Sequence, residues 1–312
     1  MTDAYPFDGW TADDHVAACP HCRAAIALLD QSAPAPAPAP PPTLREAVLS
    51  KARRRRSPAL LGVATVAVPY AEQVALMDDL LGGLRGEQWD APVPRHGTVA
   101  GLVEHLMAND AVVARFMGAP PVTLSAAPSA AVPPAVLAGG AAGTQRRWRE
   151  QAGVLLERVS AGTEVLLGVE VALAGARPSR APLRQALVQR TFETWTHADD
   201  IRAATGRSRA APRDGHVRLI AEFGLALLPR AFKGPRRGVS VTVVLTGPGG
   251  GTWTIPLSPA SDHVAVLVSA DAVDFCRLMA GRWPPDAFPY AAEGDPALAR
   301  DLVRAASTLG CD

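Results

Sequence analysis

Four polar residues whose side chains could bind a metal or take part in catalysis share one predicted helix over residues 182–206. They are Arg190, Glu193, His197 and Asp200, spaced three or four positions apart. Glu193 and His197 stand one helical turn apart, roughly 6 Å, so a carboxylate oxygen and an imidazole nitrogen could hold one divalent metal between them. Asp200 could then accept a hydrogen bond from the ring N–H of His197. The alternative is a solvated, charged helix face without a metal.

The helix itself is predicted from its ends and its apolar stripe. Pro182 suits a first helical turn and Gly206 a C-terminal stop. The residues that recur at helical spacing and are expected to face a core are Leu183, Leu187, Trp195 and Ala198.

A second candidate site lies near the N-terminus, where His15, Cys19 and Cys22 form an H-x-x-x-C-x-x-C pattern. On a helix ending near Pro20, His15 and Cys19 share a face, and the C-x-x-C turn brings Cys22 to the same point, as tetrahedral zinc requires. The fourth ligand stays open. Two alternatives also stay open: a redox dithiol without metal, or cysteines without a function.

Composition narrows the class of protein. The chain has 312 residues, 48% of them hydrophobic, which suffices for two or three folded units. A net charge of +1 gives no argument for direct nucleic-acid binding. The first residues lack a basic n-region and no apolar run is long enough to span a bilayer, so we expect a cytoplasmic protein that does not bind membranes. Four cysteines are too few for a disulfide framework.

The chain is expected to divide into four parts. Residues 1–31 carry the zinc-like motif, and residues 32–67 form a Pro/Ala linker followed by a basic helix over residues 44–56. The basic helix could contact nucleic acid or an acidic partner surface, or simply be solvated. Residues 68–233 are expected to form a bundle of four main helices, with a long loop at residues 118–143. Its second helix carries His105 and places Leu102, Leu106, Val113 and Phe116 in the core.

Residues 234–312 change from helical to alternating periodicity. Three predicted strands, at residues 239–247, 252–257 and 263–269, read as an antiparallel meander, and two helices follow, with Ser269 and Asp295 as N-caps. Arg282 follows the first of these helices. By its position it is interpreted as a structural cap at the C-terminus of its helix, stabilised by the helix dipole.

Five stretches resemble segments of a known family. FETWTHADDIRAATG, together with Trp89, Gly97, Thr98 and His105 in WDAPVPRHGTVAGLVEHLMAND, resembles the metal-binding bundle of the mycothiol-dependent maleylpyruvate isomerases. GTWTIPL, LMAGR and AAEGDPALARDLV resemble their sterol-carrier-like C-terminal domain. The resemblance runs from about Val68 to the C-terminus. It implies an α plus α/β multi-domain chain with a DinB-like four-helix bundle and an α+β C-terminal domain.

The family resemblance also implies a site and a reaction. The metal, zinc most readily, would be held by His105, Glu193 and His197, with Arg282 reaching the cleft to bind a substrate carboxylate. Mycothiol would supply a thiolate that adds to a double bond of a small electrophile, and elimination would follow after bond rotation; related bundles transfer the thiol instead. The chain would therefore be an isomerase or S-transferase with a low-molecular-weight thiol and an electrophile as partners.

The N-terminal motif resembles that of zinc-containing anti-sigma factors, although the upstream fourth ligand of that family has no counterpart here. This resemblance implies a different function, in which the motif and the helix over residues 44–56 bind a sigma factor and the bundle senses a thiol. The sequence thus leaves an enzyme and a redox- or thiol-responsive regulator as alternatives.

Overall fold

The computed structural model describes residues 12–32, 62–118, 140–173, 179–232, 236–259, 261 and 263–310. The chain divides into two compact units, residues 1–54 and residues 55–312, which are described separately. The first unit contains α1 (Ala12–Ala18) and α2 (Pro20–Ser32). The predicted linker, the basic helix, most of the long loop at residues 118–143 and Cys311 lie outside the described residues.

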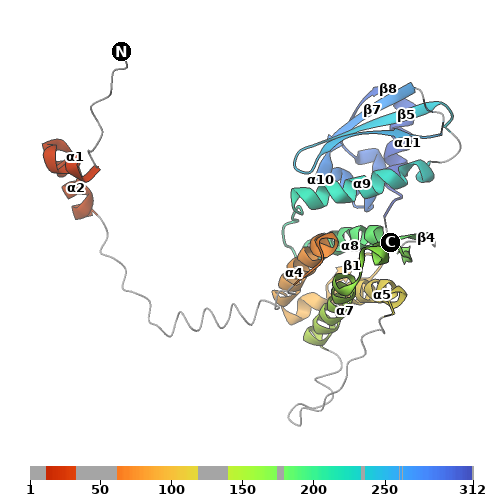
Figure 1. Ribbon diagram of the computed structural model, residues 1–312, viewed down its shortest axis with the longest axis horizontal. Coiled ribbons are helices and arrows are strands. Elements are labelled where there is room, and N and C mark those ends of the chain that lie inside the picture. Colours follow the sequence, from red (N-terminus) through yellow and green to blue (C-terminus); the bar gives the residue numbers. More distant parts are fainter. Residues whose placement is uncertain are drawn as a thin grey trace, which may run out of the picture. The chain divides into compact units, whose positions relative to one another are not determined.

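The second unit begins with a helical bundle (Figure 1). Its four main helices are α4 (Val68–Gly82), α5 (Val99–Phe116), α7 (Ala141–Ala161) and α8 (Leu183–Ala204). Short segments connect them: the 3-10 helices Thr65–Ala67, Gly86–Asp90 and Glu164–Gly168, and the hairpins β1 (Pro92–Val93) with β2 (Gly97–Thr98) and β3 (Glu170–Leu173) with β4 (Ser179–Pro182). The four main helices match those that the periodicity predicts.

Helix α8 is the centre of the unit because it contributes to two cores. Leu183, Leu187 and Ala198 are buried with side chains of α4, α5 and α7. Trp195 instead packs into the core of the C-terminal domain. The polar side of α8 is buried as well, with Arg190 only 1% exposed. The interpretation of this side as a solvated face is therefore wrong, because the neighbouring helices cover it.

One predicted core residue of the bundle lies at the surface. Leu102, Leu106 and Val113 of α5 are buried, but Phe116 is 40% exposed. It is the last residue of α5, where the helix leaves the bundle, and the guanidinium of Arg180 lies 5.0 Å from its ring centroid. The cation covers one ring face where no core side chains are available.

The C-terminal part begins with α9 (Asp214–Ala231) and continues with β5 (Val239–Thr246), β6 (Gly251–Pro256), β7 (His263–Asp271), α10 (Ala272–Met279), the 3-10 helix Pro285–Ala287, β8 (Ala291–Gly294) and α11 (Pro296–Ala306). Side chains of α9, α10, α11 and the sheet share one core. Figure 1 shows these three helices on the same side of the sheet. Helix α9, which we assigned to the bundle part of the chain, thus buries its apolar side in the C-terminal core.

The sheet has the order β6-β5-β7-β8, and the prediction of an antiparallel meander is wrong for one pair. Strands β5 and β6 form an antiparallel hairpin, but β7 pairs parallel to β5 on its other side. The more apolar β7 thereby occupies a central position, where Val266 and Val268 are buried. The fourth strand, β8, has the sequence AAEG and gives no strand pattern, so the sequence did not predict it.

The two C-terminal helices begin with aspartate caps. Asp295 accepts hydrogen bonds from the backbone N–H groups of Ala297 and Leu298, which confirms the predicted cap of α11. The cap of α10 is Asp271, two residues after the predicted Ser269, because β7 extends further than its alternation indicates. Among the described residues, no helix combines the length and apolar character needed to cross a membrane.

Candidate metal centre

Three histidines converge inside the second unit. His96 comes from the loop of the β1–β2 hairpin, His105 from α5 and His197 from α8. One potential ligand atom from each lies within 4.8 Å of the other two. The ring centroids are 4.5 Å apart for His96 and His105 and 5.4 Å apart for His105 and His197. Three imidazoles in this arrangement form a donor set that fits a divalent metal and leaves one tetrahedral position for another ligand.

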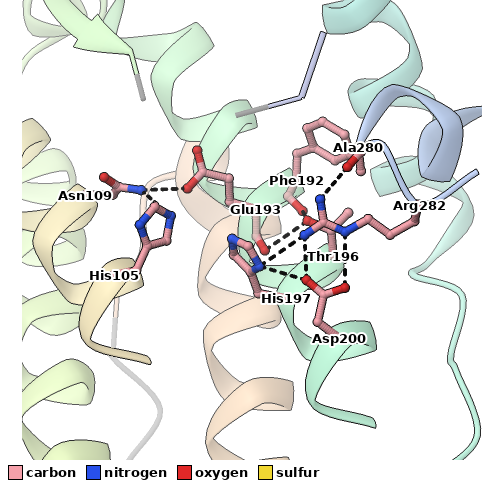
Figure 2. Close-up of polar contacts among 9 residues, drawn as sticks. All are labelled: His105, Asn109, Phe192, Glu193, Thr196, His197, Asp200, Ala280 and Arg282. Atoms are coloured by element: carbon pink, nitrogen blue, oxygen red, sulfur yellow. Dashed lines mark hydrogen bonds and ion pairs between the residues drawn. The ribbon is translucent and has the colours of Figure 1, made fainter. Parts of the chain in front are cut away.

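The start of α5 positions His105. The hydroxyl of Thr98 accepts a hydrogen bond from the backbone N–H of Gly101 at 3.2 Å and caps the helix. His105 follows two turns later, and Asn109 one turn after that. The side-chain amide of Asn109 lies 3.0 Å from His105 Nε2 and donates to Glu193 Oε2 at 3.0 Å. Asn109 therefore links the α5 histidine to α8 (Figure 2).

His197 is held by a chain of polar contacts that reaches the C-terminal domain. Its Nδ1 lies 3.0 Å from Asp200 Oδ2 on the next turn. Arg282 donates through Nε to Asp200 Oδ1 at 3.1 Å and through Nη2 to Oδ2, and it also donates to the carbonyl of Ala280. A histidine whose Nδ1 is held by a carboxylate keeps Nε2 oriented for a metal, and here Nε2 of His197 is buried. Figure 2 shows Arg282 and Asp200 on the same side of His197.

Asp200 remains a carboxylate in this setting. Its burial favours the neutral form and is the largest single influence on its pKa. The hydrogen bonds from His197 and Arg282 and their charges act in the opposite direction and together lower the pKa below its ordinary value. The group that orients His197 is therefore anionic at neutral pH.

Glu193, which the spacing pairs with His197 as a ligand, lies outside the three-histidine group. Its Oε2 accepts from Asn109, and its Oε1 forms an ion pair with Nη2 of Arg190. Glu193 and Arg190 are 2% and 1% exposed, and Asp110 of α5 lies 3.8 Å from Nη1 of the same guanidinium. A buried cation therefore lies between two buried carboxylates, one on α5 and one on α8, the helices that carry His105 and His197.

Asp110 is the most perturbed carboxyl of this group. Burial raises its pKa to about 7, while the charge of Arg190 and the nearby polar groups of Tyr70 and Trp148 act to lower it. Burial also raises the pKa of Tyr70 well above its usual range, and the negative charge of Asp110 adds to this effect. Tyr70 belongs to α4 and Trp148 to α7, so side chains from all four bundle helices lie close to this buried group.

A second arginine of the C-terminal domain reaches α8 beside Arg282. Arg277 of α10 donates through Nη2 to Asp199 Oδ2 at 3.0 Å, and its guanidinium lies 5.7 Å from the Trp195 ring centroid. Asp199 also accepts from the backbone N–H of Ala210 at 3.0 Å. Two consecutive carboxylates on α8 thus each bind one arginine of the C-terminal domain, which fixes that domain against the helix that carries His197.

A cavity of about 490 Å³ is bordered by Asp200, which contacts His197, and by Arg95, which precedes His96. It is lined by the hairpin residues Pro92, Pro94 and Arg95, by Asp200, Ala203, Ala204 and Arg209, and by Gly281 and Arg282. Three arginines make this space attractive to an anionic or polar small molecule. Because the lining residues neighbour two of the three histidines in sequence, a bound molecule would lie close to the candidate metal centre.

In the first unit, the predicted residues also come together. His15, Cys19 and Cys22 each offer a ligand atom within 4.8 Å of the others, and Cys22 Sγ lies 3.3 Å from His15 Nε2. Hydrogen bonds from the backbone and side chain of Cys22 lower the pKa of Cys19, whereas the hydrogen bond to Cys19 raises that of Cys22. Cys276, by contrast, is fully buried, and burial raises its thiol pKa.

His96 is the site residue that the sequence analysis did not single out. It lies in a Pro-Arg-His-Gly-Thr turn rather than on a helix, so it takes no part in a helical spacing pattern. The available signal was its place in the chain, immediately before the helix that carries His105. A turn at a helix start can bring a side chain back over the first turns of that helix, which is what the β1–β2 hairpin does here.

Comparisons with known proteins identify the bundle. Residues 70–202 match the family model of the mycothiol maleylpyruvate isomerase N-terminal domain. Among solved structures, the chain is similar to a mycothiol-dependent maleylpyruvate isomerase and to a histidine-to-alanine mutant of it, with 16% identity in both cases and TM-scores of 0.47 and 0.48. Each comparison covers 72% of this chain and 91% of the other. Comparison with curated proteins gives no match.

The matched residues include α5 and α8, with His105, Glu193, His197 and Asp200, and the hairpin with His96. Residues 70–202, which hold the three histidines, are therefore similar to the N-terminal domain of the mycothiol maleylpyruvate isomerases.

Proposed function

We propose that the protein is a metal- and mycothiol-dependent isomerase or S-transferase that acts on a small electrophile in the cytoplasm. The observation that carries the proposal is the convergence of His96, His105 and His197, with His197 oriented by Asp200. The family model, named for a mycothiol-dependent isomerase, supports it. A bound divalent metal, for which zinc is the best candidate, would lower the pKa of a thiol entering its open position.

The residues around the centre have complementary tasks in this proposal. Asp200 accepts a hydrogen bond from the Nδ1–H of His197, which fixes the ring orientation, and Arg282 holds Asp200 through two hydrogen bonds. Arg282 also lines the cavity together with Arg95 and Arg209, so its positive charge faces a bound substrate. Arg282 and Asp200 are therefore positioning residues for the histidine, and Arg282 in addition presents charge to a substrate carboxylate.

The test is turnover by the zinc-loaded protein with maleylpyruvate, and separately with an activated aryl halide, each with and without mycothiol. The proposal expects product formation that requires both zinc and mycothiol and is lost in His105→Ala. His263→Ala, which removes an exposed histidine of β7, is the matched control and should retain full activity. Turnover that is independent of the thiol, or equal loss in both variants, would contradict the proposal.

The His15, Cys19 and Cys22 cluster favours a second candidate, a thiol-responsive regulator that binds a sigma factor through its first unit. The low pKa of Cys19 makes it the more reactive of two adjacent thiols, which suits metal release on oxidation. The test is binding of an extracytoplasmic-function sigma factor to the zinc-loaded chain. If the protein is such a regulator, a complex forms and is lost on oxidation and in Cys19→Ser. Failure to detect a complex in either redox state would exclude this function.

A further inference from the structure

The third histidine of the centre is held by a hairpin rather than by a bundle helix, and the hairpin is fixed against both helices that carry the other two. The loop of residues 94–96 closes with a hydrogen bond from the backbone N–H of His96 to the carbonyl of Val93 at 3.3 Å. Strand β1 contacts α8 and both strands contact α5. The position of His96 is therefore set by the same elements that position His105 and His197.

Two backbone features indicate that this placement is specific. Arg95 has a φ of 67° at the third position of the turn, where glycine is the usual residue. Such strained non-glycine residues persist where the surroundings determine them, and they gather at functional sites. In addition, a Cβ on Gly101 would lie 2.3 Å from the carbonyl oxygen of His96. The first turn of α5 thus has a glycine where the backbone of His96 rests on it.

The imidazole of His96 points into the cluster. Its ring centroid lies 4.5 Å from that of His105 and 5.1 Å from that of His197, and its Nε2 is buried. Nitrogen ligands of a tetrahedral zinc lie roughly 3.4 Å from one another. Since the three candidate atoms already lie within 4.8 Å of one another, small side-chain movements would close them around an ion.

Glu193 is engaged elsewhere on both oxygens. Coordination through Oε1 would take the carboxylate from Arg190, which is 1% exposed and whose charge needs a buried partner. Coordination through Oε2 would displace Asn109, whose amide contacts both Glu193 and His105 Nε2 and so fills the position between these two residues. Figure 2 shows Glu193 directed towards Asn109.

We infer that the metal of this bundle is held by His96, His105 and His197, and that Glu193 stays outside the coordination shell as the anionic partner of Arg190 and Asn109. This departs from the histidine, glutamate and histidine set that the family resemblance implies. Three neutral ligands leave the full double positive charge of the ion in the site, which favours an anionic fourth ligand such as a thiolate. The inference rests on the proposed function for the presence of a metal, and specifies what holds it.

The experiment uses the full chain with Cys19→Ser and Cys22→Ser, so that only the bundle binds metal. The dissociation constant for Co²⁺ is measured by competition with a chromogenic chelator, and the visible absorption of the Co²⁺ complex is recorded. His96→Ala should weaken binding at least 100-fold and change the spectrum, whereas Glu193→Gln should change affinity less than 10-fold and leave the spectrum intact. His263→Ala is the control for removal of an exposed histidine.

A second pair of variants tests the hairpin without touching any ligand. Gly101→Ala should weaken Co²⁺ binding because the new methyl group pushes the His96 backbone away from α5. Gly153→Ala makes the same change inside α7, where a Cβ would meet nothing within 4 Å, and should bind as the parent does. Equal affinities for this pair would count against the inference.

X-ray absorption of the Zn²⁺ complex provides a readout that needs no ligand variant. Three imidazoles in the shell support the inference, and two imidazoles with a carboxylate overturn it. Loss of metal in Glu193→Gln with retention in His96→Ala would also overturn the inference while leaving a metal-dependent function in place. Absence of Co²⁺ binding by the parent chain would overturn the proposed function itself.

Discussion

Replacing Arg190 by methionine is expected to destabilise the bundle in a way that depends on pH. Arg190 is the cation that lies between two buried carboxylates, Asp110 and Glu193. Methionine has a similar length without the charge, so the substitution leaves both carboxylates buried and removes their partner. Breaking a buried ion pair in this way costs about 3 to 5 kcal/mol of unfolding free energy when the remaining group is ionised.

The pKa of Asp110 sets the direction of the pH dependence. It is raised by burial from its ordinary value of 3.8 to about 7 even with Arg190 present, which corresponds to roughly 4 kcal/mol against the charged form. A raised carboxyl pKa means that the native state binds more protons than the unfolded state, so its stabilising contribution is complete below the unfolded pKa and is lost as pH rises through the native one. Without Arg190, the native pKa of Asp110 rises further and the loss extends to higher pH.

The assay is urea unfolding of Arg190→Met and of the parent at pH 5.5 and pH 8, followed by circular dichroism. The expected loss is about 3 to 5 kcal/mol at pH 8 and clearly smaller at pH 5.5, where Asp110 is already protonated. Arg184→Met, an exposed arginine on the same helix, should cost less than about 1 kcal/mol at both pH values. An equal loss for Arg190→Met at both pH values would refute the buried-charge account.

Three further outcomes follow from the contacts. Arg282→Lys removes the bidentate contact with Asp200 and should raise the Zn²⁺ dissociation constant of the bundle by about 10- to 100-fold, measured by chelator competition. Arg304→Lys should leave this constant unchanged, because that exposed arginine pairs with Asp286 in the C-terminal domain. Asp199→Asn weakens the contact with Arg277, so amide hydrogen exchange should accelerate in α10 while α7 keeps its rate. Cys19→Ser should lower the zinc content by one ion per chain and leave the bundle ion bound; loss of both ions would show that the sites are not independent.

The sequence predicts the bundle well because local signals and packing agree there. The stripe of α8 that begins at Leu183 is buried as its periodicity indicates, and the ends of the helix lie close to Pro182 and Gly206. The sheet was harder to predict. Alternation identifies β5, β6 and β7 but says nothing about which edge of β5 receives β7, since this depends on the route of the connecting loop.

The candidate site could be predicted only in part, for a similar reason. His197 and Asp200 share one helix, so their spacing alone places the carboxylate beside Nδ1. Spacing also puts Glu193 one turn from His197, but it cannot show that Arg190 and Asn109 engage both of its oxygens. His96 belongs to no periodic pattern, and its place in the cluster depends on how the hairpin loop of residues 94–96 folds back over α5.

The central claim is that the histidine cluster of the bundle holds a metal that a low-molecular-weight thiol approaches. The most direct measurement is a titration of the Co²⁺-loaded chain, carrying Cys19→Ser and Cys22→Ser, with mycothiol while the absorption spectrum is recorded. The account predicts a saturable spectral change in this chain and none in the same chain with His105→Ala and His197→Ala. A chain that binds no Co²⁺, or one whose Co²⁺ spectrum does not respond to mycothiol, would contradict it.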